Sequence, residues 1–259
     1  MSLFDLTSKI AVITGSTKGI GSAIAHRLAE HGANVVVSSR KEDVCDQVAT
    51  EINARWGAGK KVAAPIPCNI SYKEQLQNLV DQTIERWGRI DILVCNAAIN
   101  PYYGPSADIS DKALDKILGT NVRSNMWLAN MVLPEMAARK DGVIILVSSI
   151  AGLRAAGDIG AYGITKAAEF QIARNIASEY GQHNIRANCI APGLIKTDFS
   201  AGLWQDDAIA KQWIDATPLR RLGEPDDIAG AAVFLASQAG AYLTGQAIVI
   251  DGGNIITGF

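Results

Sequence analysis

The sequence predicts an α/β fold with a three-layer, doubly wound parallel sheet of the Rossmann type. Short apolar runs alternate with stretches of helical periodicity, which is the pattern of repeated β-α-β units. Most of these runs are continuous rather than alternating, as expected for parallel strands that helices cover on both faces. No linker, internal repeat or low-complexity stretch interrupts the pattern, so the 259 residues are expected to form one domain, 1–259.

Seven apolar runs are predicted to be the strands of this sheet. Each run is short, and the segment before the next one is long enough for a crossover connection. Right-handed crossovers are expected, because a twisted parallel pair packs its connection back onto the sheet in that sense. The runs are Ile10–Thr14, Asn34–Ser38, Lys61–Ile66, Asp91–Cys95, Val143–Val147, Ile185–Ile190 and Ala247–Ile250.

Helices are predicted between the strands from periodicity and from end signals. The segment Gly19–His31 carries apolar residues four positions apart and is expected to end at Gly32. The spacing Ser71-x-x-Glu74 predicts a capping box at the start of another helix. Further helices are expected after Ser110, over Tyr162–Tyr180 and with Pro225 in a first turn.

Composition excludes several classes of protein. Hydrophobic residues make up 48% of the chain and charged residues 19%, which favours a folded core over disorder. The net charge of -2 provides no basic field for nucleic acid or an anionic membrane. The four cysteines lack CxxC spacing and the histidines do not pair at i,i+4, so no metal site is expected. The N-terminal residues lack the basic-then-apolar order of a signal peptide, and a cytoplasmic location is expected.

A glycine-rich turn, Thr14-Gly-Ser-Thr-Lys-Gly-Ile-Gly21, lies between the first strand and the first helix. Glycine lets a pyrophosphate approach the backbone and rest on the free N–H groups of the helix N-terminus. The alternative is a turn that serves only tight strand–helix packing. The position between strand and helix favours a dinucleotide site, whose predicted residues here are Gly15, Ser16, Lys18, Gly19, Ile20 and Gly21.

The end of the second strand indicates which dinucleotide binds. An NAD enzyme usually carries an acid there, but no carboxylate precedes Glu42. Ser39 and Arg40 instead offer a hydroxyl and a bidentate cation that fit a 2′-phosphate. Lys18 is expected to add a second positive charge on the same side. NADP(H) is therefore predicted, with NAD(H) and a merely solvated basic turn as the alternatives.

Tyr162 and Lys166 are four residues apart and should lie on one helix face, and Ser149 follows the fifth strand. A phenol can give a proton to the alkoxide that forms when a carbonyl receives hydride, and a nearby ammonium should lower its pKa. A serine hydroxyl can hold the substrate oxygen. The alternative is a tyrosine packed beside a surface lysine.

The motifs together resemble the short-chain dehydrogenase/reductase family over nearly the whole chain. They occur in the family's order, and the branch they are most similar to is the NADPH-dependent carbonyl reductase/retinol dehydrogenase branch. They are TGSTKGIG, CNAA at Cys95–Ala98, Asn121 in TNVRS, Ser149, Tyr162 with Lys166, Pro192-Gly193 and Asp251-Gly-Gly.

The resemblance implies roles for further residues. Asn121 would join Ser149, Tyr162 and Lys166 as the catalytic set, through a water-linked proton relay with Lys166. Lys166 would also hold the nicotinamide ribose. Asn69 stands where the family has an acid that bonds the adenine, and Ala98 where it has glycine. The remaining cofactor-binding residues implied are Ile70, Asn96, Ala97, Tyr162, Pro192, Gly193, Ile195 and Thr197.

The segment from about residue 192 to 223 is expected to be irregular, and loops of that length usually carry function. It stands where the family has its lid (about 194–223), and its aromatic residues suggest an apolar substrate wall. The prediction is hydride transfer between NADP(H) and a carbonyl or secondary alcohol, with carbonyl reduction as the expected direction. The resemblance implies a homo-oligomer, a tetramer or a dimer. An NAD-dependent alcohol dehydrogenase and a non-catalytic dinucleotide sensor are the alternatives.

Overall fold

The computed structural model describes residues 2–257 and contains one seven-stranded parallel sheet. The order β3-β2-β1-β4-β5-β6-β7 reverses direction between β1 and β4, so the sheet is doubly wound as predicted. The remaining residues of the predicted domain, Met1 and the last two, lie outside the described part. The strands are β1 (Ile10–Thr14), β2 (Asn34–Ser38), β3 (Ala63–Pro65), β4 (Ile92–Cys95), β5 (Gly142–Val147), β6 (Ile185–Pro192) and β7 (Ala247–Ile250).

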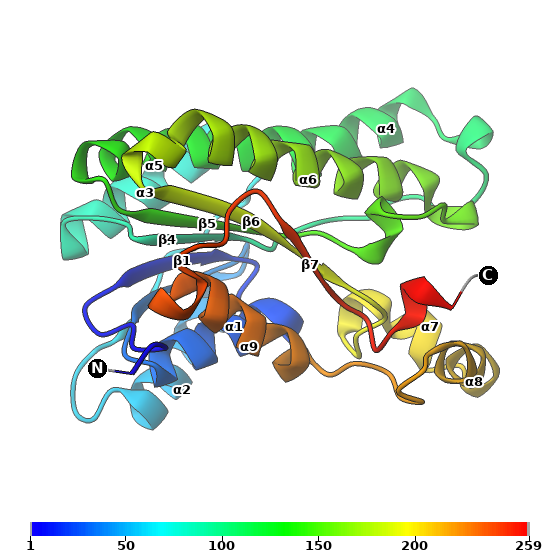
Figure 1. Ribbon diagram of the computed structural model, residues 1–259, viewed down its shortest axis with the longest axis horizontal. Coiled ribbons are helices and arrows are strands. Elements are labelled where there is room, and N and C mark those ends of the chain that lie inside the picture. The colour runs from blue at the N-terminus through cyan, green and yellow to red at the C-terminus, as the bar shows by residue number, and fades with distance from the viewer. Residues whose placement is uncertain (1, 258–259) are drawn as a thin grey trace.

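Helices cover both faces of the sheet and complete the three layers (Figure 1). One layer holds α3 to α6, and the other holds α1, α2 and α9 (Figure 1). A single π-helical turn, Gly119–Arg123, joins α4 to α5 without a loop. The helices are α1 (Gly19–Glu30), α2 (Glu42–Trp56), α3 (Lys73–Trp87), α4 (Asp111–Leu118), α5 (Ser124–Arg139), α6 (Gly160–Tyr180), α7 (Ala201–Trp204), α8 (Asp207–Ala216) and α9 (Pro225–Ala236).

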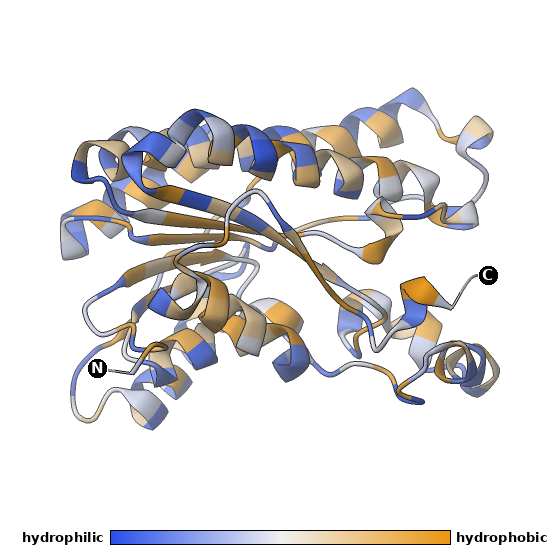
Figure 2. Cartoon of the chain, viewed as in Figure 1, coloured by the Kyte–Doolittle hydropathy of each residue, from blue (hydrophilic) through white to orange (hydrophobic). Residues whose placement is uncertain are grey.

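The strands pack into a separate apolar core on each face, which explains their continuous apolar runs. In β1, Ala11 and Ile13 belong to the core under α1 and α9, whereas Val12 belongs to the core under α3, α5 and α6. Neighbouring strand residues point to opposite faces, so both faces need apolar side chains. The strands are accordingly hydrophobic, and the helices carry hydrophilic residues on their outer turns (Figure 2).

Two predictions about local structure are wrong. The helix after β3 begins at Lys73 with Tyr72 as its N-cap, and no side chain caps it. Ser71 does not form the expected capping box because its hydroxyl lies 3.1 Å from the Thr120 hydroxyl. The segment 192–223 is not irregular, since it contains α7 and α8, which lie beyond the end of the sheet (Figure 1). Asp206 caps α8 by accepting hydrogen bonds from the N–H groups of residues 208 and 209.

The first helix, the strand positions and the late helix with Pro225 in its first turn are confirmed. The shortest strand is β3, which covers only Ala63–Pro65 of the predicted 61–66. Within residues 2–257, no helix has the length and apolar character that crossing a bilayer requires.

Candidate active site

A cleft of ≈ 1590 Å³ runs along the carboxyl ends of the strands. Open parallel sheets bind ligands at this edge, beside the reversal in strand order. One wall is the glycine turn after β1, and the opposite wall includes Tyr162 and Ser149. The cleft continues to α7 and α8, so one cavity joins the predicted cofactor residues to the predicted substrate wall.

The glycine turn forms a cradle that only glycine fits. Gly15 and Gly19 have φ values of +67° and +56°, in the left-handed region that residues with a Cβ rarely adopt. A Cβ on Gly21 would fall on the carbonyl oxygen of Gly15 and within 2.5 Å of Asn96 Nδ2. The turn thus leaves its backbone open to a ligand, which fits a bound pyrophosphate.

Buried polar groups fix this turn to the strands. The Ser16 hydroxyl donates to Ile13 O at 2.7 Å and accepts from Ser38 N–H at 2.8 Å. Ser16 is therefore buried behind the turn and does not line the cleft, unlike the other residues predicted there. Asn96 lines the cleft, and its Nδ2 donates to Thr14 O at 3.0 Å and to Gly15 O at 3.1 Å. The side chain of Asn96 joins the turn after β4 to the turn after β1.

The end of the cleft predicted to hold the adenosine is lined by Ser39, Arg40, Asn69 and Ile70. Arg40 is exposed, and within residues 2–257 no carboxylate lies within 4.0 Å of its guanidinium. Lys18 differs from the prediction because its Nζ lies 2.8 Å from Asp198 Oδ2. Arg40 therefore supplies an unbalanced positive charge, whereas the charge of Lys18 is paired with the lid.

Tyr162, near the start of α6, and Ser149, after β5, both line the cleft. Burial raises the pKa of Tyr162 above its ordinary value, although Lys166 and a hydrogen bond with Ser149 act in the opposite direction. The Lys166 ammonium thus acts on the pKa of Tyr162 in the predicted direction, but burial outweighs it, so the net direction is upward. The Lys166 ammonium lies 5.5 Å from the centroid of the Tyr162 ring. At neutral pH the phenol keeps its proton.

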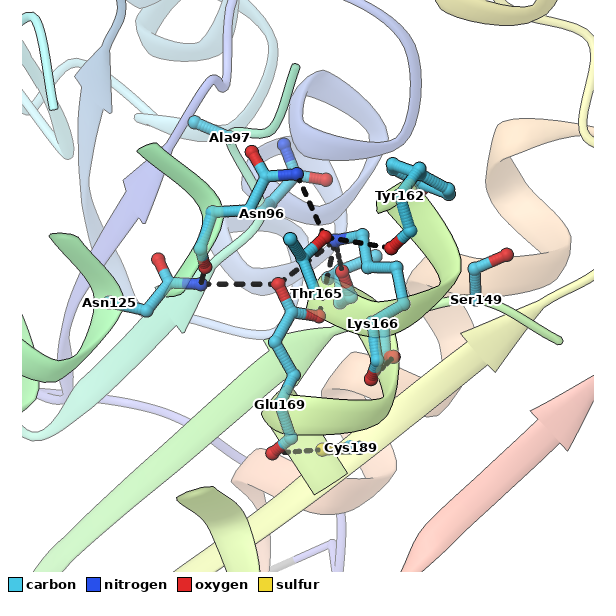
Figure 3. Close-up of polar contacts among 12 residues, drawn as sticks. Asn96, Ala97, Asn125, Ser149, Tyr162, Thr165, Lys166, Glu169 and Cys189 are labelled. Carbon is cyan, nitrogen blue, oxygen red and sulfur yellow. Dashed lines mark hydrogen bonds and ion pairs between the residues drawn. The ribbon is translucent and has the colours of Figure 1, made fainter. Parts of the chain in front are cut away.

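Lys166 is held by a carboxylate, Glu169, that belongs to none of the sequence motifs. Its Nζ lies 3.0 and 3.1 Å from the two oxygens of Glu169 (Figure 3). The same ammonium donates to Val147 O at 2.8 Å. The side chains of Lys166 and Glu169 are only 2% and 1% exposed. Burial lowers the pKa of Lys166, but Glu169 and Tyr162 outweigh it and raise the pKa above its ordinary value. Burial also raises the pKa of Glu169, to about 7.

Asn121 lies in the π-helical turn and is buried behind the cleft rather than lining it. Its side chain accepts from Ile99 N–H at 2.9 Å and donates to Ile99 O at 2.9 Å and to Thr165 Oγ1 at 3.1 Å. The backbone carbonyl oxygen of Asn121 accepts from Asn125 Nδ2 at 2.8 Å. The same Asn125 amide nitrogen lies 3.3 Å from Glu169 Oε1. A chain of hydrogen bonds thus connects Asn121 to Lys166 through Asn125 and Glu169, and the water-linked relay stays a prediction.

The remaining predicted cofactor residues lie together on the far side of the cleft. Ala97 follows β4, Pro192 is the last residue of β6 and the others follow it; all of them line the cavity. Ile195 pairs with Gly223 in a short parallel bridge, which closes the base of the lid. These lining residues are Ala97, Pro192, Gly193, Ile195 and Thr197.

The end of the cleft predicted to hold the substrate is lined by Phe199, Leu203 and Trp213 from the lid. The Phe199 ring centroid lies 5.9 Å from that of Tyr162. Trp204 does not line the cleft, because its Nε1 donates to Thr197 O at 2.8 Å. Arg154 lines the same end, where its Nη2 donates to Asn254 Oδ1 at 2.8 Å.

Comparisons with known proteins agree with this geometry. Residues 15–254 match the family model described as "Enoyl-(Acyl carrier protein) reductase". The chain is 41% identical over 248 residues to "Dehydrogenase/reductase SDR family member 4" of Oryctolagus cuniculus, covering 96% of this chain and 94% of that protein. A gluconate 5-dehydrogenase from Burkholderia cenocepacia J2315, in complex with NADP and tartrate, superposes with a TM-score of 0.92 and 31% identity over 98% of each chain. A 7α-hydroxysteroid dehydrogenase complexed with NADH and 7-oxo glycochenodeoxycholic acid has a TM-score of 0.91 and 37% identity, covering 97% of this chain and 96% of that one.

Proposed function

The chain belongs to the short-chain dehydrogenase/reductase family, and we propose that it uses NADP(H) to interconvert a carbonyl and a secondary alcohol. As a member of this family it is an oxidoreductase that transfers hydride between a nicotinamide dinucleotide and a CH–OH group. The observation that supports the proposal best is one continuous cleft, with the glycine cradle on one wall and Tyr162 and Ser149 on the other. Carbonyl reduction is the proposed direction.

The residues present fit a dinucleotide along the whole cleft. The open backbone at Gly15, Gly19 and Gly21 suits a pyrophosphate, which a Cβ at Gly21 would exclude. Asn69 and Ile70 would hold the adenine, and the residues after β4 and β6 the nicotinamide end. A reduced nicotinamide bound there would supply the hydride that a substrate carbonyl carbon accepts.

Arg40 supports NADP(H) over NAD(H). Its exposed guanidinium faces the adenosine end of the cleft without a carboxylate partner, and Ser39 lines the same surface. An arginine fork there would bind a 2′-phosphate through paired hydrogen bonds. NAD(H) is the second candidate, because a solved relative of this fold is complexed with NADH.

Tyr162 is proposed as the general acid and base. Its pKa, which burial raises, keeps it protonated near neutral pH, as a proton donor for carbonyl reduction must be. The Ser149 hydroxyl would hold the substrate oxygen beside it, and Lys166 would grip the ribose. Asn121 would support the set by fixing α6 to the segment after β4 through Thr165 and Ile99.

The lid, residues 194–223, is proposed to close over a small carbonyl or alcohol substrate. Phe199, Leu203 and Trp213 make its inner surface apolar, which suits a substrate with an apolar body. A homo-oligomer, tetramer or dimer, and a cytoplasmic location remain predictions that accompany this proposal.

The experiment that tests the proposal is a panel of aldehydes, α-dicarbonyls, cyclic ketones and retinoids, each with NADPH and with NADH. The absorbance of the reduced nicotinamide reports turnover directly. We expect turnover of at least one carbonyl class, with a higher kcat/KM for NADPH. Tight dinucleotide binding without turnover on any member would overturn the proposal and support a dinucleotide sensor.

A further inference from the structure

Glu169 is a buried carboxylate at the centre of the site with no role in the proposed reaction so far. It lies on α6, three residues after Lys166, and both of its oxygens face the Lys166 ammonium (Figure 3). We infer that Glu169 is a positioning residue for the proposed function: it holds Lys166 and balances its charge, so that Tyr162 stays a proton donor.

The hydrogen bonds around Lys166 support this role. An ammonium has three N–H donors, and in this structure three acceptors surround it: Val147 O and the two oxygens of Glu169. Lys166 is therefore held toward the sheet, although it also lines the cleft. To grip a ribose hydroxyl, it must give up one of these contacts. Glu169 thus competes with the ribose for the ammonium.

The stability of the fold alone does not explain why the ion pair between Lys166 and Glu169 is buried. Burying an ion pair costs desolvation that its attraction often fails to repay, and apolar residues of similar size usually serve as well. Glu169 nevertheless lies in the middle of the core on the inner face of α6, where Phe170 and Ala173 pack. Asn125, from α5, donates to the same carboxylate at 3.3 Å and connects it to the carbonyl oxygen of Asn121. A polar chain crosses this core from the π-helical turn to Lys166.

Lys166 and Tyr162 are the groups on which the charge of Glu169 acts most directly. The charge of Glu169 also acts on the thiols of Cys95 on β4 and Cys189 on β6. Burial raises the pKa of both thiols, that of Cys95 to about 12. Both thiols therefore stay neutral. On α5, Asn125 is neutral, and after β5 the Ser148 hydroxyl is neutral as well.

The sign of the effect follows from these contacts. A carboxylate near Tyr162 disfavours the phenolate, whereas the Lys166 ammonium favours it. With its pKa raised to about 7, Glu169 is charged in the alkaline range where alcohol oxidation needs the phenolate as base. Removing its charge leaves the ammonium unbalanced, and the phenolate then forms at lower pH.

The test is the pH profile of Glu169→Gln. We expect the rise of kcat/KM for alcohol oxidation with NADP⁺ to move to lower pH by about one unit, the size typical of one lost charge neighbour. Glu169→Asp keeps the charge and should retain the wild-type position of this rise. Asn125→Ala, which removes a donor to the carboxylate, should move it in the same direction by less. Glu179→Gln, the same change at an exposed position of α6, is the matched control and should change nothing.

A profile of Glu169→Gln that coincides with the wild-type profile, with lower rates or a lower Tm only, would overturn the inference and make Glu169 structural. If Glu169→Gln does not fold, an unshifted profile for Asn125→Ala decides against the inference in the same way. Failure of the proposed function looks different, because then the wild-type protein itself shows no turnover.

Discussion

The two ends of the cleft are built in different ways. At the dinucleotide end, the turns after β1 and β4 are tied together by buried hydrogen bonds from Ser16 and Asn96. At the substrate end, α8 has no buried residue, and Phe199 is 51% exposed. The dinucleotide end is a rigid extension of the sheet. The substrate end is formed by the lid, residues 194–223, which is a separate cover over the cleft.

Exposed ion pairs join the lid to the rest of the molecule. An exposed ion pair joins Lys18 in the glycine turn to Asp198 in the lid, and another joins Lys196 to Glu224. Pairs this exposed contribute little, because water and salt screen them. The chemistry-bearing Tyr162 and Ser149 come from α6 and the loop after β5, on the sheet side. Substitutions at the rigid end should therefore abolish dinucleotide binding. Substitutions in the lid should only change the KM for the substrate.

The largest effect on dinucleotide affinity is expected from Gly21→Ala. The added Cβ falls on the carbonyl oxygen of Gly15, and neither backbone can move without breaking the turn. Overpacking of this kind costs up to about 3 kcal/mol, so the affinity for NADPH should fall by about 100-fold. Calorimetric titration measures it. Gly181→Ala, where an added Cβ meets nothing within 4 Å, is the control and should bind normally. Unchanged affinity in Gly21→Ala would contradict the assignment of this turn.

Arg40→Asp should reverse the dinucleotide preference. The carboxylate repels a 2′-phosphate and can accept from a ribose hydroxyl, so kcat/KM should fall for NADPH by roughly 10- to 100-fold and rise for NADH. Lys60→Asp makes the same charge change at an exposed position outside the cleft and should leave the preference alone. Equal losses of kcat/KM with NADPH and NADH would show that Arg40 does not bind the 2′-phosphate.

A smaller effect is expected from Phe199→Ala in the cover. Loss of an aromatic surface beside Tyr162 should raise the KM for a substrate with an apolar body by about 5- to 10-fold, since each tenfold change is 1.4 kcal/mol. The Kd for NADPH should stay the same. Tyr242→Ala removes an exposed aromatic ring outside the cleft and serves as the control. A matching loss of NADPH affinity would mean that the two ends are not separate.

The smallest effect is expected from Asp198→Asn, which removes the ion pair between cover and turn. The KM for the substrate should change by only about 2-fold, and the dependence of this KM on salt concentration should become weaker. Asp215→Asn removes an ion pair of the same kind that lies within α8 and should keep the wild-type salt dependence. Steady-state kinetics at low and high salt distinguish the two variants. A change of tenfold or more would show that the ion pair governs closure.

The same contrast explains what the sequence could predict. The glycine turn, the strands and the spacing of Tyr162 and Lys166 are local patterns, and each of them lies where it was expected. Of the two lid helices, α7 is a single turn of four residues and too short to show a period. The apolar residues of α8 do have helical spacing and are half-buried on one face, so this helix was within reach of the sequence; they are Ile209, Ala210, Trp213 and Ile214.

Properties that depend on tertiary contacts could not be predicted. The direction of the Tyr162 pKa follows from burial, and the pairing of Lys18 follows from where the lid lies. The sequence does indicate one property of Glu169, because it is an acid three residues after Lys166 on the same helix. That spacing indicates an ion pair, but only the fold shows that the pair is buried against β5.

The Tyr162 hydroxyl is proposed to exchange the proton in a cleft that also binds the dinucleotide. The most direct test measures turnover and NADPH binding side by side for Tyr162→Phe. We predict that turnover falls by about 10²- to 10⁴-fold, as for loss of a general acid, while the Kd for NADPH changes little. Tyr103→Phe, which removes another hydroxyl from the same cleft, should keep most of the activity. Turnover close to the wild-type rate in Tyr162→Phe would contradict the account.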